Sequence, residues 1–313
     1  MFDGAIIAAR FVQFGFALVL FGASLFCVYG VRAETTRIGG GYWNWPRLAL
    51  SLGATGALLG TAWWVTLQTA LFFPEAGALD RDALGVLLGE TQFGQACLVR
   101  FGLLLISIAL TLAAPATANI GIAQSVLGAG VLASFAWTGH GASDVGWPGA
   151  IHTGADILHL LAAGLWIGAL SVLCHLLLQS RHKRSEADAR IVLYGLERFS
   201  GIGPALVSVL VLTGLINSWF LLGAASWSAL LASFYGFALA AKLLLFGGML
   251  ALAAANRYRL GPLLKADLER NGFPAAALAR LRASLLTETA LALLVVMAVA
   301  ALGTFEPPYI ENS

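Results

Sequence analysis

Eight long apolar runs dominate the sequence, and they constrain what the chain can fold into more than any other feature. Each run is close to or longer than the ~20 residues that an α-helix needs to cross ~30 Å of hydrocarbon. The runs cover approximately residues 5–30, 48–73, 93–114, 118–137, 151–178, 199–222, 235–255 and 283–303. We therefore predict an all-α, polytopic membrane protein, built as a bundle of eight transmembrane helices.

The composition excludes a soluble globular protein. Hydrophobic residues make up 59% of the 313 positions and charged residues 11%, against about 45–50% and about 25% in ordinary globular proteins. A soluble domain cannot hide so much apolar surface, whereas a lipid bilayer accepts it. The net charge of +2 is too small to suggest a nucleic-acid partner. No linker divides the chain, so residues 1–313 are predicted to form one transmembrane domain.

Basic residues are distributed unevenly among the predicted connections, and this asymmetry predicts the orientation in the membrane. Three lie between the first and second runs, five between the fifth and sixth, and six between the seventh and eighth. These fourteen of the 18 Lys and Arg residues are Arg32, Arg37, Arg47, Arg181, Lys183, Arg184, Arg190, Arg198, Arg257, Arg259, Lys265, Arg270, Arg280 and Arg282. Cytoplasmic connections carry the excess of positive charge, so both termini are predicted to be periplasmic. The segment 223–234 is too short to span and is predicted to be an interfacial loop or half-helix.

Three cations, Arg10, Arg100 and Lys242, fall inside the predicted spans. An ionisable group in hydrocarbon is costly unless it reaches water or a partner. Lys242 lies beyond the start of its span by a depth of roughly 10 Å. Asp156 is the acid predicted at a comparable depth, so we expect Lys242 and Asp156 to approach within hydrogen-bonding distance, directly or through one water. Glu288 enters the last span from the opposite side.

Histidines on the predicted outer side form the most informative pattern. His140 follows the fourth run, and His152, Asp156 and His159 stand at i, i+4 and i+7 in the fifth. These three lie within a stripe of roughly 60° on one helix face. Imidazole and carboxylate groups are ligands for copper, zinc and iron, and a carboxylate near a ligating His also orients its ring. We predict a metal site made of His140, His152, Asp156 and His159, although the spacing does not select the metal.

Two functions are compatible with this pattern. In the first, the His and Asp side chains form the outer metal site of a transporter. In the second, two histidines on different helices, such as His140 and His159, ligate a haem iron, and the three intramembrane cations pair with its propionates. Those cations outnumber the one buried acid Asp156, which is unfavourable for a site that attracts a cation. No enzymatic activity is predicted, and redox activity is expected only in the haem alternative.

Deeper in the bundle the sequence shows no evident chain of metal ligands. Thioether groups suit Cu(I), but only Met249 and Met297 lie in spans, at no paired spacing, and both are predicted to pack against their neighbours. The polar residues that remain to carry a metal ion further are Asn217, Asn256 and Glu288.

At these residues the chain resembles the copper resistance protein D (CopD) family of bacterial inner-membrane proteins, over nearly its whole length. The stretches that carry the resemblance are ETQFGQACLVRFGLLL (90–105), WTGHGA (137–142), ADILHLLAAGLWIGAL (155–170), RFSGIGPALVSVLVLTGLINSW (198–219), YGFALAAKLLLFGGMLALAAANRYRLGP (235–262) and LRASLLTETALALLVVMAVAALGTFEPP (281–308). The family positions matched residue by residue are Arg100, His140, Asp156, His159, Trp166, Lys242, Asn256 and Glu288. His152 is added from its spacing alone.

The resemblance implies an eight-helix protein of the inner membrane that handles copper and takes it from the periplasm toward the cytoplasm. It also implies a periplasmic copper-binding partner of the CopC type. No β-sandwich of that kind is encoded in this sequence, so the partner is expected to be a separate chain. Arg100, Lys242, Asn256 and Glu288 are expected to support the metal route as intramembrane polar groups.

Overall fold

The structure is a computed structural model that describes residues 3–37, 44–113, 117–139, 146–183, 185–222, 230 and 233–305. Eight helical stretches within these residues are long and apolar enough to cross a membrane, and the described residues contain no strand. They are Asp3–Thr35, Arg47–Phe72, Gln92–Ala113, Asn119–Thr138, Gly146–Leu178, Glu186–Leu222, Phe234–Arg270 and Ala275–Leu302. The predicted bundle of eight spans is confirmed.

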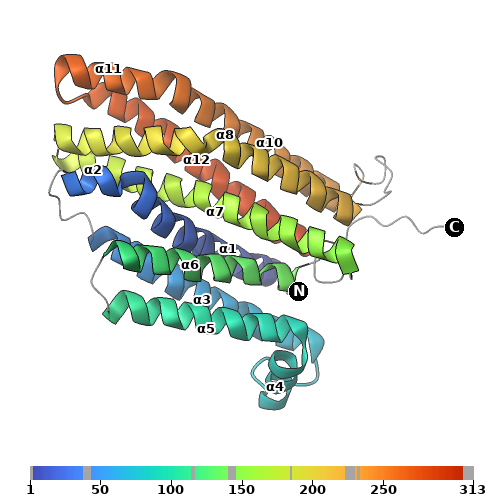
Figure 1. The fold of residues 1–313 in the computed structure, drawn as a ribbon. Coiled ribbons are helices and arrows are strands. Elements are labelled where there is room, and N and C mark those ends of the chain that lie inside the picture. Colours follow the sequence, from blue (N-terminus) through green and yellow to red (C-terminus); the bar gives the residue numbers. More distant parts are fainter. Residues whose placement is uncertain are drawn as a thin grey trace.

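The first half of the chain forms one side of the bundle (Figure 1). Its spans are α1 (Asp3–Phe26), α3 (Asn44–Phe72), α5 (Gln92–Ala113) and α6 (Ala118–Ser134). Three shorter elements accompany them: α1 continues through the π-helix η1 (Cys27–Val31) into α2 (Arg32–Arg37), and the 3-10 turn η2 (Ala136–Thr138) follows α6. The short helix α4 (Arg81–Glu90) connects α3 to α5 at the other end of the bundle from α2.

The second half forms the other side. Its spans are α7 (Gly146–Lys183), α8 (Glu186–Leu222), α10 (Phe234–Ala255) and α12 (Ala275–Leu302). The helix α10 continues through the π-helix η4 (Asn256–Leu260) into α11 (Gly261–Asn271). Ser233 caps α10 by accepting a hydrogen bond from the backbone N–H of Gly236. Most of the 223–234 connection lies outside the described residues, so its predicted interfacial form stays a prediction.

The basic connections differ from the loops expected at 179–198 and 256–282, because both regions are largely helical. The helix α7 runs to Lys183 and α8 starts at Glu186, while α10 continues as helix to Asn271. Hydropathy marks where a helix leaves the hydrocarbon, but it does not mark where the helix ends. Ala, Leu, Glu, Lys and Arg, which are frequent in both regions, favour helix in water as well. The described basic residues of these regions, such as Arg190, Arg259 and Lys265, therefore lie on helical extensions of the spans.

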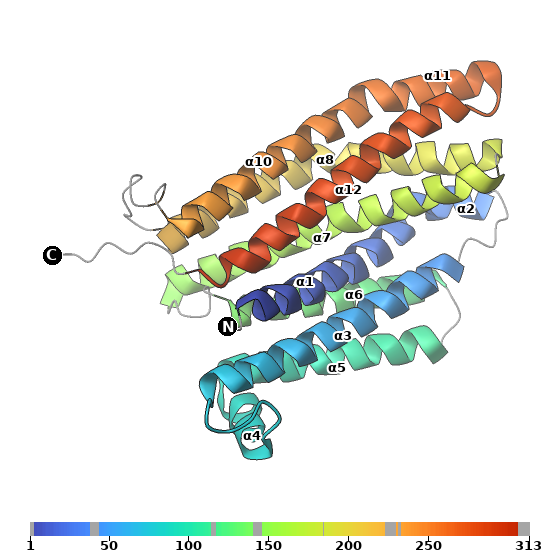
Figure 2. The same ribbon diagram turned by 180° about the vertical axis from the view of Figure 1, so that it is seen from behind.

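The helix α1 lies between the two halves and packs against α3 and α6 on one side and α7 and α12 on the other (Figures 1 and 2). Glycines allow α1 and α7 to approach closely. A Cβ on Gly22 would lie 1.8 Å from the carbonyl oxygen of Gly164, and a Cβ on Gly168 would lie 2.0 Å from the backbone carbon of Gly22. Small residues at such contacts are typical of helix packing in membranes, so this crossing joins the halves through backbone contact.

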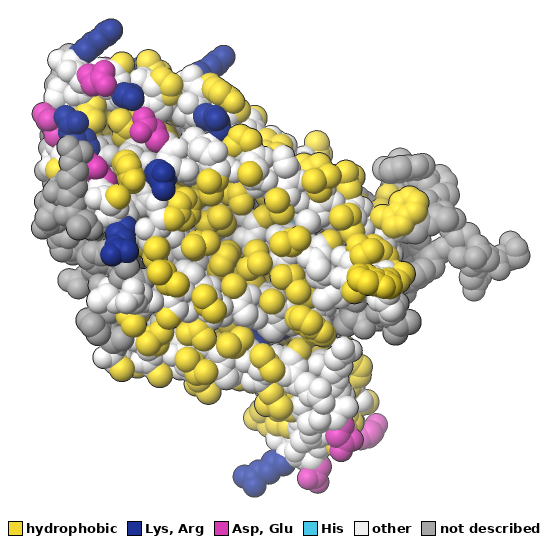
Figure 3. Space-filling view, viewed as in Figure 1, with side chains coloured by type: hydrophobic (Ala, Val, Ile, Leu, Met, Phe, Trp, Pro, Cys, Tyr) yellow, Lys and Arg dark blue, Asp and Glu magenta, His cyan; other side chains and the backbone are white. Residues whose placement is uncertain are grey.

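Charge and apolar surface are separated along the bundle. Figure 3 shows Lys and Arg side chains gathered at the end where α2 and α11 lie, with an apolar band across the middle of the face. The helix α4, at the other end, carries its own small group of charges. This distribution is consistent with the predicted orientation, which itself stays a prediction.

Candidate functional site

The three described residues of the predicted metal site all lie on one face of α7 and meet α8. The ring of His152 stacks on Phe220, with centroids 4.8 Å apart and planes 7° apart. Asp156 Oδ1 accepts a hydrogen bond from Asn217 Nδ2 at 3.4 Å, and His159 Nδ1 lies 2.9 Å from Thr213 Oγ1. The predicted stripe is therefore present as a helix face, and each of its members has its own partner on α8.

The hydrogen bonds around Thr213 determine the tautomer of His159. The Thr213 hydroxyl has two carbonyl acceptors on its own helix, Val209 at 2.6 Å and Leu210 at 3.4 Å, and we assign its single proton to the nearer one. Thr213 Oγ1 is then an acceptor for the ring, so His159 Nδ1 carries the hydrogen. In a neutral imidazole the other nitrogen, Nε2, then keeps its lone pair. A histidine held in this way, with one N–H donated and one lone pair available, has the arrangement of metal-ligating histidines.

The complete four-residue metal site is not tested by this geometry. Among the described residues no three His, Cys, Asp or Glu side chains come together in an arrangement that holds a metal ion. His152 and His159 are separated by roughly 10 Å along α7. His140 lies outside the described residues, so the predicted site stays a prediction. The haem alternative depends on His140 too, because His152 and His159 share one helix face and do not bracket an iron.

Two cations and a histidine surround Asp156. Its carboxylate interacts electrostatically with His152, Lys242 and Arg10. Lys242 and Asp156 are both described, and no direct ion pair or hydrogen bond joins them. The direct contact that we predicted is therefore absent, and a contact through one water stays a prediction. Arg10 is held differently, because its Nε donates to the carbonyl oxygen of Ala300 on α12 at 3.2 Å.

Arg100 belongs to the first half of the bundle and not to the site on α7. Its side chain is 0% exposed. The guanidinium donates to Ser134 Oγ at 2.8 Å, and at 3.1 Å to Ser134 O, Gln13 Oε1 and Thr138 Oγ1. It also lies 3.8 Å from the centroid of the Phe135 ring. Neutral oxygens thus occupy most of its donors, which fits a structural role and leaves little capacity for a haem propionate.

A cavity of about 270 Å³, which we call the outer cavity, lies between α7, α8, α10 and α12, on the His159 side. His159 and Trp166 line it from α7, and Lys242 and Met249 line it from α10. Most of its remaining lining is apolar. Met249 was predicted only to pack against neighbours; it is indeed buried, but its thioether also lines the cavity that contains His159.

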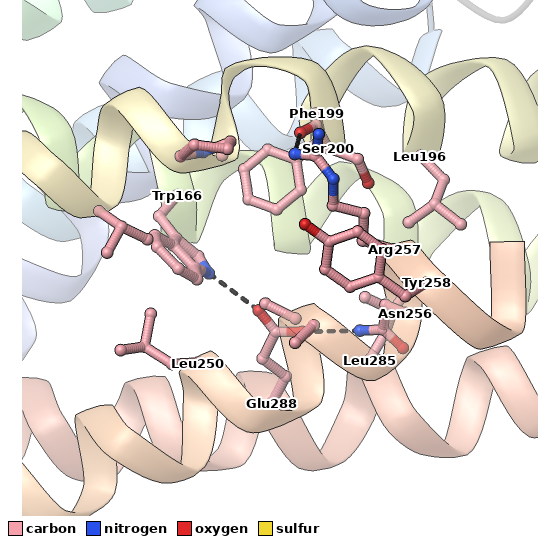
Figure 4. A pocket seen from close by; sticks show the side chains of 15 residues that line it. Trp166, Leu196, Phe199, Ser200, Leu250, Asn256, Arg257, Tyr258, Leu285 and Glu288 are labelled. Atoms are coloured by element: carbon pink, nitrogen blue, oxygen red, sulfur yellow. Dashed lines mark hydrogen bonds between the residues drawn. The ribbon is translucent and has the colours of Figure 1, made fainter.

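A second cavity of about 310 Å³, which we call the inner cavity, lies between the same four helices, nearer the basic end (Figure 4). Asn256 and Glu288, expected as supporting polar residues, come together in its wall. Trp166 Nε1 donates to Glu288 Oε1 at 2.9 Å, and Asn256 Nδ2 donates to Glu288 Oε2 at 2.8 Å. Glu288 is 0% exposed and Asn256 3% exposed, so this carboxyl group is buried between two N–H donors.

Trp166 marks the boundary between the two cavities, because it lines both. Its ring makes edge contacts with Phe199 of α8 and Phe246 of α10, at centroid distances of 5.9 and 6.2 Å. Trp166 was expected only from the family resemblance, and Thr213 and Phe220 were not predicted. The signal that would have found them is the i, i+4, i+7 spacing of Thr213, Asn217 and Phe220, which mirrors the stripe on α7.

Comparisons with known proteins agree with these features. Residues 1–150 match the family described as "Copper resistance protein D-like, N-terminal domain", and residues 193–302 match "Copper resistance protein D". Copper resistance protein D of Pseudomonas syringae pv. tomato is 33% identical over 310 residues, which cover 98% of each chain. No solved structure matches the chain.

Two further relatives are more distant. Inner membrane protein YebZ of Escherichia coli (strain K12) is 26% identical over 281 residues, covering 84% of this chain and 87% of YebZ. Copper transport protein CutJ of Bacillus subtilis (strain 168) is 34% identical over 127 residues, covering 41% of this chain and 22% of CutJ. With the full-length relative and the eight apolar spans together, the chain belongs to the copper resistance protein D family of multi-pass inner-membrane proteins.

Proposed function

We propose that this protein moves copper across the inner membrane, from the periplasm toward the cytoplasm, between α7, α8, α10 and α12. The observation that carries the proposal is the state of His159. Its Nδ1–H is held by Thr213, and its ring lines the outer cavity. The lone pair on Nε2 is therefore the metal ligand that this cavity offers.

Groups of the predicted outer site and one further residue of the outer cavity suit the same cargo. Asp156 offsets part of the positive charge of an arriving ion, and His152 with His140 completes the predicted outer site. Met249 adds a thioether deeper in the same cavity, and thioether and imidazole ligands both suit copper. The family membership and the printed name of the relative CutJ, a copper transport protein, support copper as the metal.

Lys242 is the group that a copper route must accommodate, because its amine lines the cavity that contains His159. In our proposal Lys242 attracts Asp156 while no metal is present, which keeps the carboxylate charged. An arriving copper ion replaces Lys242 as the partner of Asp156. Lys242 thus supplies, while no metal is present, the positive charge beside Asp156 that copper supplies later. No catalytic step is involved.

Delivery on the periplasmic side is assigned to a separate copper-binding protein of the CopC type. The family resemblance supports this partner. The outer ends of α7, α8 and α10 carry His152, Asn217 and Tyr235, so a partner that docks at this end of the bundle reaches the predicted outer site.

The test uses purified protein in liposomes that contain a trapped, membrane-impermeant copper indicator. His159→Ala should slow the appearance of copper inside by at least about tenfold, since one ligand lost at a metal site typically costs that much or more. His175→Ala is the matched control, because it removes the same side chain from the same helix near its basic end. Copper uptake by His159→Ala equal to that of the parent would contradict the proposal. A haem absorption band in the purified parent would instead favour the haem alternative.

A further inference from the structure

The buried carboxyl group of Glu288 occupies an unusual position in the inner cavity. It is 0% exposed, and most of the side chains that line the cavity with it are apolar. Within the described part of the chain no Lys, Arg or His forms an ion pair with it. Its two oxygens accept hydrogen bonds from Trp166 and Asn256 only.

Opposing influences act on this carboxyl group. Burial in apolar surroundings disfavours its charged form, whereas two donated N–H bonds favour that form. A group balanced in this way can change its protonation state at a small free-energy cost.

The other charged or titratable groups around Glu288 are Cys174 of α7, which interacts electrostatically with it, and Arg257 and Tyr258 of η4. Ser200 is the one polar side chain among the α8 residues that line the cavity, and it is not titratable. On α1, the charged residue Arg10 contacts α12 at Ala300, far from Glu288 at the opposite end of the helix.

Arg257 does not neutralise Glu288, although both line the cavity. Its guanidinium donates to the backbone carbonyl oxygen of Ser200 and lies 5.4 Å from the centroid of the Tyr258 ring. Figure 4 shows Arg257 directed toward Ser200, away from the Trp166–Glu288–Asn256 row. Arg257 and Tyr258 belong to η4 and line the cavity, so the cavity that holds Glu288 reaches the helical extension at the basic end of α10.

Asn256 supplies an independent observation. Its side chain is 3% exposed, and its Oδ1 accepts no hydrogen bond from any described residue. A buried oxygen without a donor is costly. Rotation of the amide by 180° exchanges its nitrogen and oxygen and places Oδ1 beside Glu288 Oε2. In that position Oδ1 needs an O–H donor, which a protonated Glu288 provides.

We propose that Glu288 is a reversible proton-binding site and that Asn256 is its adjustable partner. In the charged state Asn256 Nδ2 donates to Oε2. When a proton from water at the basic end adds to Oε2, an O–H bond forms, the amide turns, and Oδ1 accepts that O–H. Trp166 keeps donating to Oε1 in both states. No electron is transferred, and release of the proton reverses each step.

This site deepens the proposed function, and its link to copper rests on that function. A cation that moves through a single bundle needs compensation of its charge. A proton that binds Glu288 from the basic end, and leaves it toward the outer cavity as copper reaches the inner cavity, provides that compensation. Proton binding itself does not depend on copper, so the two parts of the inference are tested separately.

The first experiment is infrared difference spectroscopy of the purified protein during acidification, read at the carbonyl stretch of protonated carboxyl groups. The parent should show a band that Glu288→Gln lacks and that Asp188→Asn retains, since Asp188 is another buried acid toward the basic end. Asn256→Leu should keep the band but shift it to the higher wavenumber of a carboxyl without an O–H acceptor. This variant keeps the test decisive if Glu288→Gln fails to fold. A spectrum identical in the parent and Glu288→Gln, or an unshifted band in Asn256→Leu, overturns the proton site.

The second experiment measures copper and pH together inside liposomes. In the parent, copper uptake should be accompanied by a pH change, and Glu288→Gln should lose the pH change. Copper uptake by the parent without a pH change overturns the coupling and leaves the proposed function intact. Absence of copper uptake by the parent overturns the proposed function and the coupling, while the infrared result still decides the proton site.

Discussion

His159 Nδ1 lies 2.9 Å from Thr213 Oγ1, across the contact between α7 and α8. We assign the direction of this hydrogen bond from the Thr213 hydroxyl, whose nearest acceptor is the carbonyl oxygen of Val209 at 2.6 Å. The threonine therefore selects the tautomer of His159 that presents Nε2 to the outer cavity. A side chain that does not touch the metal thus determines which nitrogen is available to it.

Removing the Thr213 hydroxyl should weaken copper binding without removing any ligand. Thr213→Val keeps the shape of the side chain but cannot accept the Nδ1–H, so the ring loses its fixed tautomer and orientation. Loss of such an outer partner typically lowers metal affinity by roughly 10–100-fold. Titration of copper against a competing chelator measures the change, and Thr213→Ser should restore affinity close to that of the parent. Equal affinities of Thr213→Val and the parent would show that Thr213 only packs against the ring.

Arg100 should be required for stability and not for copper affinity. Arg100→Met removes a guanidinium that donates four hydrogen bonds in the first half of the bundle, and it deprives the buried Ser134 Oγ of its donor. Each hydrogen bond to a charged group contributes about 1.5–3 kcal/mol, so the thermal unfolding temperature in detergent should fall clearly. Arg81→Met, on the exposed helix α4, is the control. A variant of normal stability with weakened copper binding would instead place Arg100 in the metal route.

The sequence alone predicts the eight spans closely, because the bilayer imposes both their length and their apolar composition. The fifth run, for example, was placed at 151–178, and the apolar span occupies Gly146–Leu178. The helical extensions beyond the membrane were not predicted, since hydropathy changes there while the backbone conformation does not. Lys265 and Arg270, two of the basic residues that set the predicted orientation, therefore lie in a helix, α11.

The contacts across helices were only partly predictable. Helices that are apolar all round carry little information about which face meets which neighbour. The stripe of His152, Asp156 and His159 was recognised because polar residues are rare in α7, but its partners on α8 were not. The meeting of Asn256 with Glu288 depends on the relative depth and rotation of η4 and α12, and only the folded bundle fixes these quantities.

The orientation in the membrane should follow the basic residues. Reporter domains inserted at Ser185, between α7 and α8, and at Gly272, between α11 and α12, should be located in the cytoplasm. Reporters at the two termini should be located in the periplasm. The reason is that positively charged connections are retained on the cytoplasmic side. A cytoplasmic C-terminus would contradict eight spans with this orientation, and it would reverse the direction of transport that we propose.

The last prediction concerns the coupling between Lys242 and Asp156, which interact electrostatically without a direct ion pair. Lys242→Met leaves Asp156 with less compensation for its buried charge, and one unpaired buried charge is more costly than none. The single variant should therefore unfold at a lower temperature than the double variant Lys242→Met/Asp156→Asn. The four proteins of this double-mutant cycle should give an interaction free energy of about 0.5–3 kcal/mol.

Asp156 keeps the neighbours Arg10 and Asn217 in every variant that retains the carboxylate, so the effect is expected near the lower end of that range. Additive effects of the two substitutions would show that Lys242 does not serve Asp156. Lys242 would then be available to an anionic group bound in the outer cavity, as the haem alternative requires, and the absorption spectrum of the purified protein would become the deciding measurement.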